Sequence, residues 1–256
     1  MIQWCAYCQS FLGQLAPFDD FSVTHGMCAD CASRFEEFDS GTIAPVTAFY
    51  GELFSQVGLG RQIDPWAFLK EVDRLGLSRA DAYLGILHPL LWRVGREFQE
   101  GRLTVAEEHL FTEAVQSILR IIGFNEAREA CDVLLVVAPG NDHTIGVEIM
   151  LRLIDEQTDL TAARGLAPRT PDDLKALVAR HQPRILGISA ALPEHLPYLQ
   201  SLRDWVDDLP GAQRPHMVVG GPAVVTASEA IPAGFQVCEP YDVGHGLGQL
   251  VSLAAH

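Results

Sequence analysis

The fold is decided by one stretch of the chain, residues 136–146, which reads VVAPGNDHTIG. It completes an apolar run, Val133 to Val137, that predicts a buried strand, and Pro139-Gly140 is a pair that ends regular structure. The apolar spacing from Val147 to Ile154 then predicts a helix. His143 is therefore expected in a loop at the carboxyl end of a strand, the edge where open parallel sheets bind ligands. Taken alone, His143 also has a plainer interpretation, an ordinary loop histidine near a helix start.

The chain from residue 131 to residue 256 alternates strand-like and helix-like segments. This alternation predicts a doubly wound parallel sheet of the Rossmann-like, flavodoxin-like kind. Ser189 ends the third strand and Gly220-Gly221 the fourth, where missing side chains would let a ligand approach the backbone. No G-x-G-x-x-G sequence follows the first strand, which disfavours a dinucleotide site. The expected strands are 132–138, 160–163, 185–190, 217–219 and 236–238, and the expected helices are 146–156, 171–181, 194–206 and 243–255.

Residues 42–130 are expected to form a four-helix bundle, because four helical patterns follow one another with short loops. Gly101-Arg102 interrupts the pattern between the last two, which predicts an antiparallel hairpin whose turn brings Phe98 close to Glu108 and His109. Taken alone, Phe98 is a core residue, and Glu108 is an acid favoured in the first turn of a helix. The helices are expected at 47–56, 65–75, 79–100 and 105–128, with apolar stripes at Leu84, Leu87, Leu91, Val94 and Phe98 and at Leu110, Ala114, Ile118 and Ile121.

Residues 1–40 contain two C-x-x-C pairs, Cys5 with Cys8 and Cys28 with Cys31. Each pair presents two thiolates from one turn, and four thiolates satisfy a tetrahedral zinc ion. A segment this short builds little core, so a metal would supply much of its folding energy. The spacing therefore predicts a structural zinc ribbon, with a redox pair or an iron–sulfur cluster as alternatives. Residues 23–31 also resemble the SHGxCxxC zinc-ribbon segment of bacterial signalling proteins.

The totals bound the class of protein. The 256 residues include 18 basic and 33 acidic side chains, a net charge of −15, which disfavours direct contact with nucleic acid. The sequence has no apolar stretch long enough for a membrane helix and no signal-peptide pattern at its start. A soluble, cytoplasmic protein is expected, with no membrane partner.

Together these motifs resemble the cobalamin-binding domain family over about residues 47–256. The family pattern is D-x-H-x-x-G, then S-x-L, then GG, at the ends of successive strands, with a helical bundle upstream. The matching residues here are Asn141, Asp142, His143 and Gly146, then Ser189 and Ala191, then Gly220 and Gly221. The resemblance implies that His143 replaces the cofactor's own base as the lower ligand of cobalt, and that the nucleotide tail runs beside Ser189 and the glycine pair. Asn141 stands where the family has an acid that hydrogen-bonds the histidine, and Ala191 where it has leucine.

The hairpin resembles that of light-sensing cobalamin regulators, which carry a W-x(9)-E-H signature over the upper face of the corrin. Here the spacing is Phe98, nine residues, then Glu108-His109, with phenylalanine in place of tryptophan. Trp92 has two interpretations, bundle core or a ring that approaches the cofactor. Light-sensing members usually carry a DNA-binding helix-turn-helix at the amino terminus, and this chain has the cysteine segment instead.

The resemblance thus implies an adenosylcobalamin-binding sensor or regulator, rather than an enzyme, which responds to light and acts on a protein partner. Homo-oligomer formation is left open. Three alternatives remain: a corrinoid methyl carrier of a methyltransferase system, a heme-binding sensor on the same fold, and a domain in which His143 binds nothing.

Overall fold

The computed structural model describes residues 1–33, 44–127, 129–165, 168, 170–238 and 243–254. They fall into two compact units, unit 1 from Met1 to Ile122 and unit 2 from Gly123 to His256. Unit 1 holds both the cysteine segment and the helices that the sequence suggests as separate parts. The division into parts at 1–40, 42–130 and 131–256 stays a prediction. Within the described residues, no helix is both long and apolar enough to cross a membrane.

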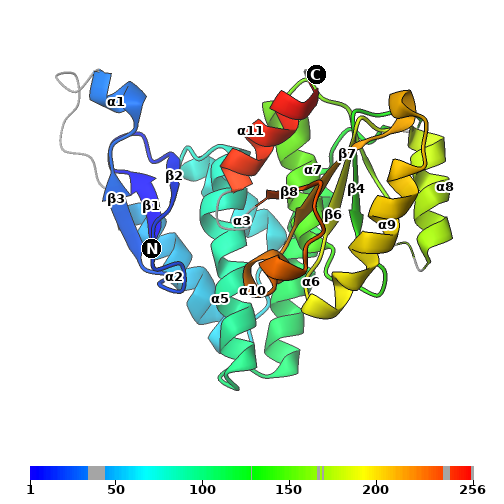
Figure 1. The fold of residues 1–256 in the computed structure, drawn as a ribbon. Helices are drawn as coiled ribbons and strands as arrows, with labels where there is room; N and C mark the ends of the chain where they lie inside the picture. Colours follow the sequence, from blue (N-terminus) through cyan, green and yellow to red (C-terminus); the bar gives the residue numbers. More distant parts are fainter. Residues whose placement is uncertain (34–43, 128, 166–167, 169, 239–242, 255–256) are drawn as a thin grey trace. The chain divides into compact units, whose positions relative to one another are not determined.

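Unit 1 begins with a three-stranded sheet in the order β2-β1-β3 (Figure 1). β1 (Ile2–Cys5) pairs antiparallel with β2 (Phe11–Gln14) and parallel with β3 (Val23–Gly26), and α1 (Ala29–Ser33) follows. The helices come next, and α6 packs against α2, α3 and α5, as a bundle requires. They are α2 (Ala44–Gly58), α3 (Pro65–Arg74), α4 (Arg79–Ala82), the π-helix η2 (Tyr83–Leu87), α5 (His88–Gln99) and α6 (Val105–Ile122).

Two expectations for these helices are wrong in detail. The single helix expected at 79–100 contains the π-helix η2, and α6 ends at Ile122 because Gly123 turns the chain with φ of +70°. The expected stripes are correct at Leu87, Val94, Ala114 and Ile118, which are buried. They are wrong at Phe98, which is 40% exposed and is not a core residue, and at Ile121, which is 36% exposed. The side chains that fill the core of these helices are Tyr83, Ile86, Leu87, Leu90, Val94, Phe111, Ala114, Val115, Ile118 and Leu119.

Unit 2 is built on a parallel five-stranded sheet, as the alternation of strands and helices predicts. The strand order is β5-β4-β6-β7-β8, which is the flavodoxin-like order. Every residue of β4 is buried, because helices cover both faces of a parallel sheet. The strands are β4 (Val133–Val137), β5 (Ala162–Arg164), β6 (Ile185–Ser189), β7 (His216–Gly220) and β8 (Phe235–Cys238).

Two apolar clusters sandwich this sheet. α7 (Ile145–Gln157) and α11 (Val243–Ala254) cover one face, and α8 (Pro171–His181) and α9 (Pro197–Asp207) cover the other (Figure 1). The 3₁₀ turns η3, η4 and η5 and the short helix α10 complete the connections, at Pro193–His195, Gly211–Gln213, Ser228–Ala230 and Ala223–Thr226. The strand expected at 160–163 lies one to two residues later, at β5, and the helix expected at 194–206 is divided into η3 and α9.

Candidate functional site

The candidate site of unit 2 lies where the order of the strands reverses. β4 is flanked by β5 on one side and by β6 on the other, so the connections that leave β4 and β6 diverge at their carboxyl ends. Such a switch point opens the crevice in which doubly wound sheets bind ligands. The ladder between the two strands runs on by one bond, from the Ala138 amide to the Ser189 carbonyl at 2.9 Å. The start of the loop that carries His143 is therefore held in place by the hydrogen bond of Ala138 to β6.

Asn141 connects His143 to the neighbouring strand. Its side chain is 1% exposed, and its Nδ2 donates to the Ser189 carbonyl at 3.0 Å. This bond orients the amide so that Oδ1 faces His143, where it accepts from the His143 amide at 2.9 Å in an Asx turn. Oδ1 also lies 2.9 Å from His143 Nδ1. Because an amide oxygen can only accept, Nδ1 carries the proton, and Nε2 is the ring nitrogen with a free lone pair.

The other residues of the loop surround an exposed ring. His143 and Asp142 are both exposed, and α7 begins two residues after the histidine, at Ile145. A Cβ added to Gly146 would meet open space, so packing does not explain this glycine. The loop thus presents one imidazole, held from behind, at the carboxyl edge of the sheet.

Close packing within the protein explains why glycine follows β7. Gly221 has φ of +97°, and a Cβ there would lie 2.5 Å from the Ala190 carbonyl oxygen. A Cβ on Gly220 would lie 3.3 Å from the Cys238 carbonyl oxygen. Gly221 is therefore needed for the close approach of the loops after β6 and β7. This packing accounts for Gly221 without a ligand, which the sequence alone did not reveal.

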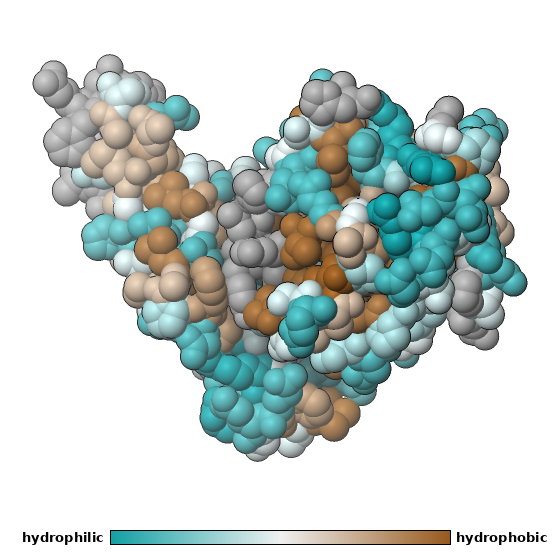
Figure 2. All heavy atoms as spheres, in the orientation of Figure 1, coloured by the Kyte–Doolittle hydropathy of each residue, from teal (hydrophilic) through white to brown (hydrophobic). Residues whose placement is uncertain are grey.

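The rim beyond β6 and β7 is apolar. Leu192 and Val225 are 41% and 47% exposed, and they belong to neighbouring segments because α10 packs against η3. Figure 2 shows apolar surface on unit 2 near β8 and α10. The buried His195 accepts a hydrogen bond at Nδ1 from the Leu192 amide at 3.2 Å and so shapes the loop after Ala191, which is itself buried. Apolar side chains beside one polar protein group, here the His143 imidazole, are the usual lining of a site for a large organic cofactor.

The residues singled out on the helical hairpin lie in unit 1. Phe98 is largely exposed near the end of α5, and Glu108 is half-buried in the first turn of α6. Glu108 accepts from the Thr112 hydroxyl at 2.7 Å, and its other oxygen lies 3.5 Å from His109 Nε2. A close approach of Phe98 to this pair stays a prediction.

Trp92 is half-buried and donates through Nε1 to His88 Nε2 at 3.2 Å. Burial lowers the pKa of His88 to about 4, so its imidazole is neutral at pH 7 and can accept this bond. The indole N–H of Trp92 is thereby satisfied within α5, and its role toward a cofactor stays a prediction.

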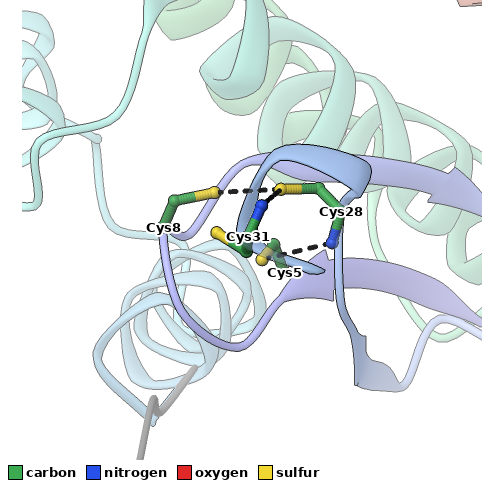
Figure 3. A group of neighbouring side chains, drawn as sticks. All are labelled: Cys5, Cys8, Cys28 and Cys31. Atoms are coloured by element: carbon green, nitrogen blue, oxygen red, sulfur yellow. Dashed lines mark hydrogen bonds between the residues drawn. The ribbon is translucent and has the colours of Figure 1, made fainter. Parts of the chain in front are cut away.

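The four amino-terminal cysteines converge on one point. Their sulfur atoms all lie within 4.8 Å of one another, and Cys8 Sγ is 3.7 Å from Cys28 Sγ (Figure 3). In a tetrahedral site with Zn–S bonds of about 2.3 Å, neighbouring sulfurs lie about 3.8 Å apart. Cys5 and Cys31 are buried, whereas Cys8 and Cys28 are more accessible. The four sulfurs are thus close enough together to hold one metal ion.

The ionisation of these thiols depends on one another. Burial opposes ionisation of Cys5, but hydrogen bonds from the backbone of Cys28, Cys8 and Tyr7 outweigh it and lower the pKa of its thiol to about 6. Burial, together with the neighbouring sulfurs, raises the pKa of Cys31 to about 12. Four adjacent thiolates repel one another without a cation, so this cluster suits a divalent ion.

Comparison with known proteins supports the resemblance to cobalamin-binding proteins for the helices of unit 1. A family model described as a B12 binding domain matches residues 67–122, which run from α3 to the end of α6. The resemblance to B12-binding proteins is thereby confirmed for these helices. No curated protein matches the chain significantly.

Three solved structures that this chain resembles are distant from it in sequence. The monomethylamine corrinoid protein of Methanosarcina barkeri is 16% identical, with a TM-score of 0.60 over 80% of this chain and 97% of that chain. A cobalamin-binding protein from Desulfitobacterium hafniense DCB-2 is 18% identical over 80% and 98%, with a TM-score of 0.39. The methanol:cobalamin methyltransferase complex of Methanosarcina barkeri is 15% identical over 77% and 78%, with a TM-score of 0.35. The first of these shows a shared fold.

Proposed function

We propose that the protein binds cobalamin at the carboxyl edge of the unit 2 sheet, with His143 Nε2 as the lower ligand of cobalt. The observation that carries this proposal is the chain of hydrogen bonds from Ser189 through Asn141 to His143. It fixes the ring and leaves one nitrogen with its lone pair free, and an orienting partner of this kind is what ligating histidines use. The family match of residues 67–122 and the fold shared with a corrinoid protein support the same cofactor.

The other motif residues have defined parts in this proposal. Asp142 precedes His143 in the loop and Gly146 lies in the first turn of α7, and both are exposed. The exposed apolar side chains of Leu192 and Val225 offer contact to a macrocycle. The nucleotide tail would run beside Ser189, Ala191 and the glycine pair. Since packing explains Gly221 by itself, tail binding rests mainly on the position of these residues at the switch point.

The cofactor is tested by adding cobalamin to the purified chain and recording its affinity and absorption spectrum. We expect His143→Ala to weaken binding at least tenfold, about 1.4 kcal/mol, and to remove the spectral change caused by histidine ligation. The matched control is His216→Ala, an exposed histidine at the opposite, amino-terminal end of β7. Equal affinity and spectra for both variants would refute ligation by His143. Loading with heme in the same way tests the alternative cofactor.

We further propose that the protein is a photoresponsive regulator which acts on a protein partner. Bound adenosylcobalamin would supply a cobalt–carbon bond that light cleaves. Phe98 supports this, because an aromatic side chain that is 40% exposed near the end of α5 is free to contact a ligand. Glu108 and His109 follow at the spacing of the light-sensing signature.

Illumination separates the regulator from the methyl carrier. Green light is expected to change the spectrum of the adenosylcobalamin-loaded chain and to change its mass or its oligomeric state in solution. An unchanged spectrum and mass, together with methyl uptake from a methyltransferase, would replace the regulator by the methyl carrier.

We also propose that the four amino-terminal cysteines bind a structural zinc ion. With four protein ligands, the ion would have no open position for catalysis. We expect one zinc per chain and its loss in Cys28→Ser, whereas Cys238→Ser in unit 2 keeps it. Retention of zinc by Cys28→Ser would exclude the site.

A further inference from the structure

The sheet that carries the cysteines is packed onto the π-helix of unit 1. Trp4 in β1 is fully buried, and a Cβ on Gly85 of η2 would lie 2.2 Å and 2.7 Å from atoms of its six-membered ring. The same Cβ would lie 2.9 Å from Phe11, whose ring packs edge-on against Trp4 with centroids 5.8 Å apart. The indole therefore touches the backbone of the π-helix, at the one residue type that leaves room for it.

Contacts of two further residues, Asp81 and Arg96, lie on either side of the contact between Trp4 and Gly85. The Phe11 amide donates to Asp81 Oδ1 at 2.8 Å, and the other carboxylate oxygen of Asp81 accepts from the Ser78 hydroxyl that caps α4. Near the other end, the Arg96 guanidinium lies over the Phe21 ring, 4.6 Å from its centroid, and donates to the Asp19 carbonyl. The segment from α4 through α5 thus contacts the sheet before and at the π-helix, and after it contacts the connection between β2 and β3.

The metal ligands are directly connected to this contact. Cys5 follows Trp4 in the chain, and its sulfur accepts from the Cys28 amide at 3.5 Å. The Ala6 amide bonds to the Gly26 carbonyl at 3.0 Å, so the two cysteine turns meet where β1 and β3 end. An ion that holds all four sulfurs would fix the backbone of Cys5 and, one peptide unit away, that of Trp4.

We infer that the four-cysteine cluster is an allosteric metal site, in which a bound Zn²⁺ ion holds Trp4 against Gly85 and thereby keeps the π-helix η2 in place. The inference rests on the zinc site proposed above and not on cobalamin. Without the ion, this short sheet loses its main support, because small segments of this kind depend on their metal to fold. Trp4 then leaves Gly85, and the wide turn loses the side chain that packs against it.

The contact between Trp4 and Gly85 affects α5 because the π-helix sets the rotation of α5 about its axis. A π-turn accommodates one residue more than an α-turn, so its conversion to α-helix would rotate α5 by about 100° relative to α4. α5 buries Leu90 and Val94, and it carries Trp92 and Phe98 outside this buried set. By holding η2 in place, bound zinc would keep this face of α5 buried and would fix the direction in which Trp92 and Phe98 point.

Hydrogen exchange of the full chain tests the coupling directly. Zinc is removed by a chelator under reducing conditions and restored by Zn²⁺ alone, and amide exchange is compared between the two states. We expect exchange in residues 79–99 to be at least tenfold faster without zinc, while the unit 2 segment 133–157 stays unchanged. Acceleration confined to residues 1–33 would overturn the coupling but leave the zinc site standing. Failure of the chain to bind zinc would overturn both.

A change in the π-helix should in turn alter the affinity of the cysteine cluster for zinc, although the residue that is changed is not a metal ligand. Because coupling between two sites is reciprocal, Gly85→Ala should weaken zinc binding about tenfold. Gly95→Ala is the matched control, since it lies in α5 and its Cβ would meet no atom within 4 Å. If Gly85→Ala does not fold, Trp4→Phe removes the ring atoms nearest Gly85 with less disturbance and should act in the same direction. Zinc affinities equal to wild type in Gly85→Ala and Trp4→Phe would refute the inference.

Discussion

The sheet edge of unit 2 and the cysteine sheet of unit 1 both carry short motifs that predict a ligand site, yet different contacts hold the two motifs in place. His143 is held by Asn141, two residues away, and by the end of the adjacent strand. The cysteine turns are attached through Trp4 to Gly85, a residue of a helix far along the chain. The first arrangement follows from the α/β fold itself, whereas the second depends on packing that no local spacing specifies.

The largest expected effect is at Trp4. Trp4→Ala removes a fully buried indole from the junction of sheet and π-helix, which should lower the free energy of unfolding by about 3–5 kcal/mol. Trp66→Ala is the control, because that side chain is 67% exposed and its loss should cost within about 0.5 kcal/mol. Denaturant unfolding followed by circular dichroism measures both. If the two variants were equally stable, the cysteine sheet would not be supported by the helices, and the contrast between the regions would disappear.

An intermediate effect is expected at the unit 2 edge. Gly221→Ala places a Cβ against the Ala190 carbonyl oxygen at a positive φ, and such strain costs about 1–3 kcal/mol. Gly146→Ala, whose Cβ would meet open space, should leave stability within about 0.5 kcal/mol of wild type. Thermal unfolding distinguishes the two. A stable Gly221→Ala variant with weakened cofactor binding would instead mean that this glycine serves the ligand.

The sequence predicted the parts of the fold that depend on local pattern. The strand from Val133 to Val137, the α8 helix from Pro171 to His181 and the parallel character of the sheet follow from apolar spacing and turn residues. It also predicted that the four cysteine sulfurs would meet. It missed η2, because a π-turn has no marker in the apolar period. It also placed Phe98 in the core, because apolar spacing does not show that the side chain near the end of α5 stays exposed.

In the candidate site, too, the sequence predicts the features set by local pattern and misses those set by contacts between distant residues. The loop position of His143 was predictable, since Pro139-Gly140 ends the strand before it. The bond from Asn141 to the Ser189 carbonyl was not, because a backbone partner on another strand leaves no trace in the residue types. Nor could the motif show that Gly221 faces the Ala190 carbonyl, which requires the register of the two strands.

The smallest expected effect on stability, and the sharpest on the site, is at Asn141. Asn141→Ala removes its hydrogen bonds to the Ser189 carbonyl, to the His143 amide and to the His143 ring. The Ser189 carbonyl still accepts from the Ala138 amide, and His143 is exposed to water, so the loss of stability should be about 1 kcal/mol. The His143 ring, however, loses the acceptor that fixes its proton on Nδ1. Nitrogen-15 NMR of the histidine ring should therefore show a single Nδ1–H tautomer in the wild type and a mixture in the variant.

The control for Asn141→Ala is Asn125→Ala, which removes an exposed amide from Asp155 in the same unit and should leave the His143 signals unchanged. A second variant, Asn141→Asp, tests the amide itself. It would set a carboxylate oxygen against the Ser189 carbonyl oxygen at the position where Nδ2 now donates at 3.0 Å, so it should be less stable than Asn141→Ala despite its similar size. An aspartate variant as stable as wild type, with the same tautomer, would show that this loop tolerates the acid and that the asparagine does not position the ring through Ser189.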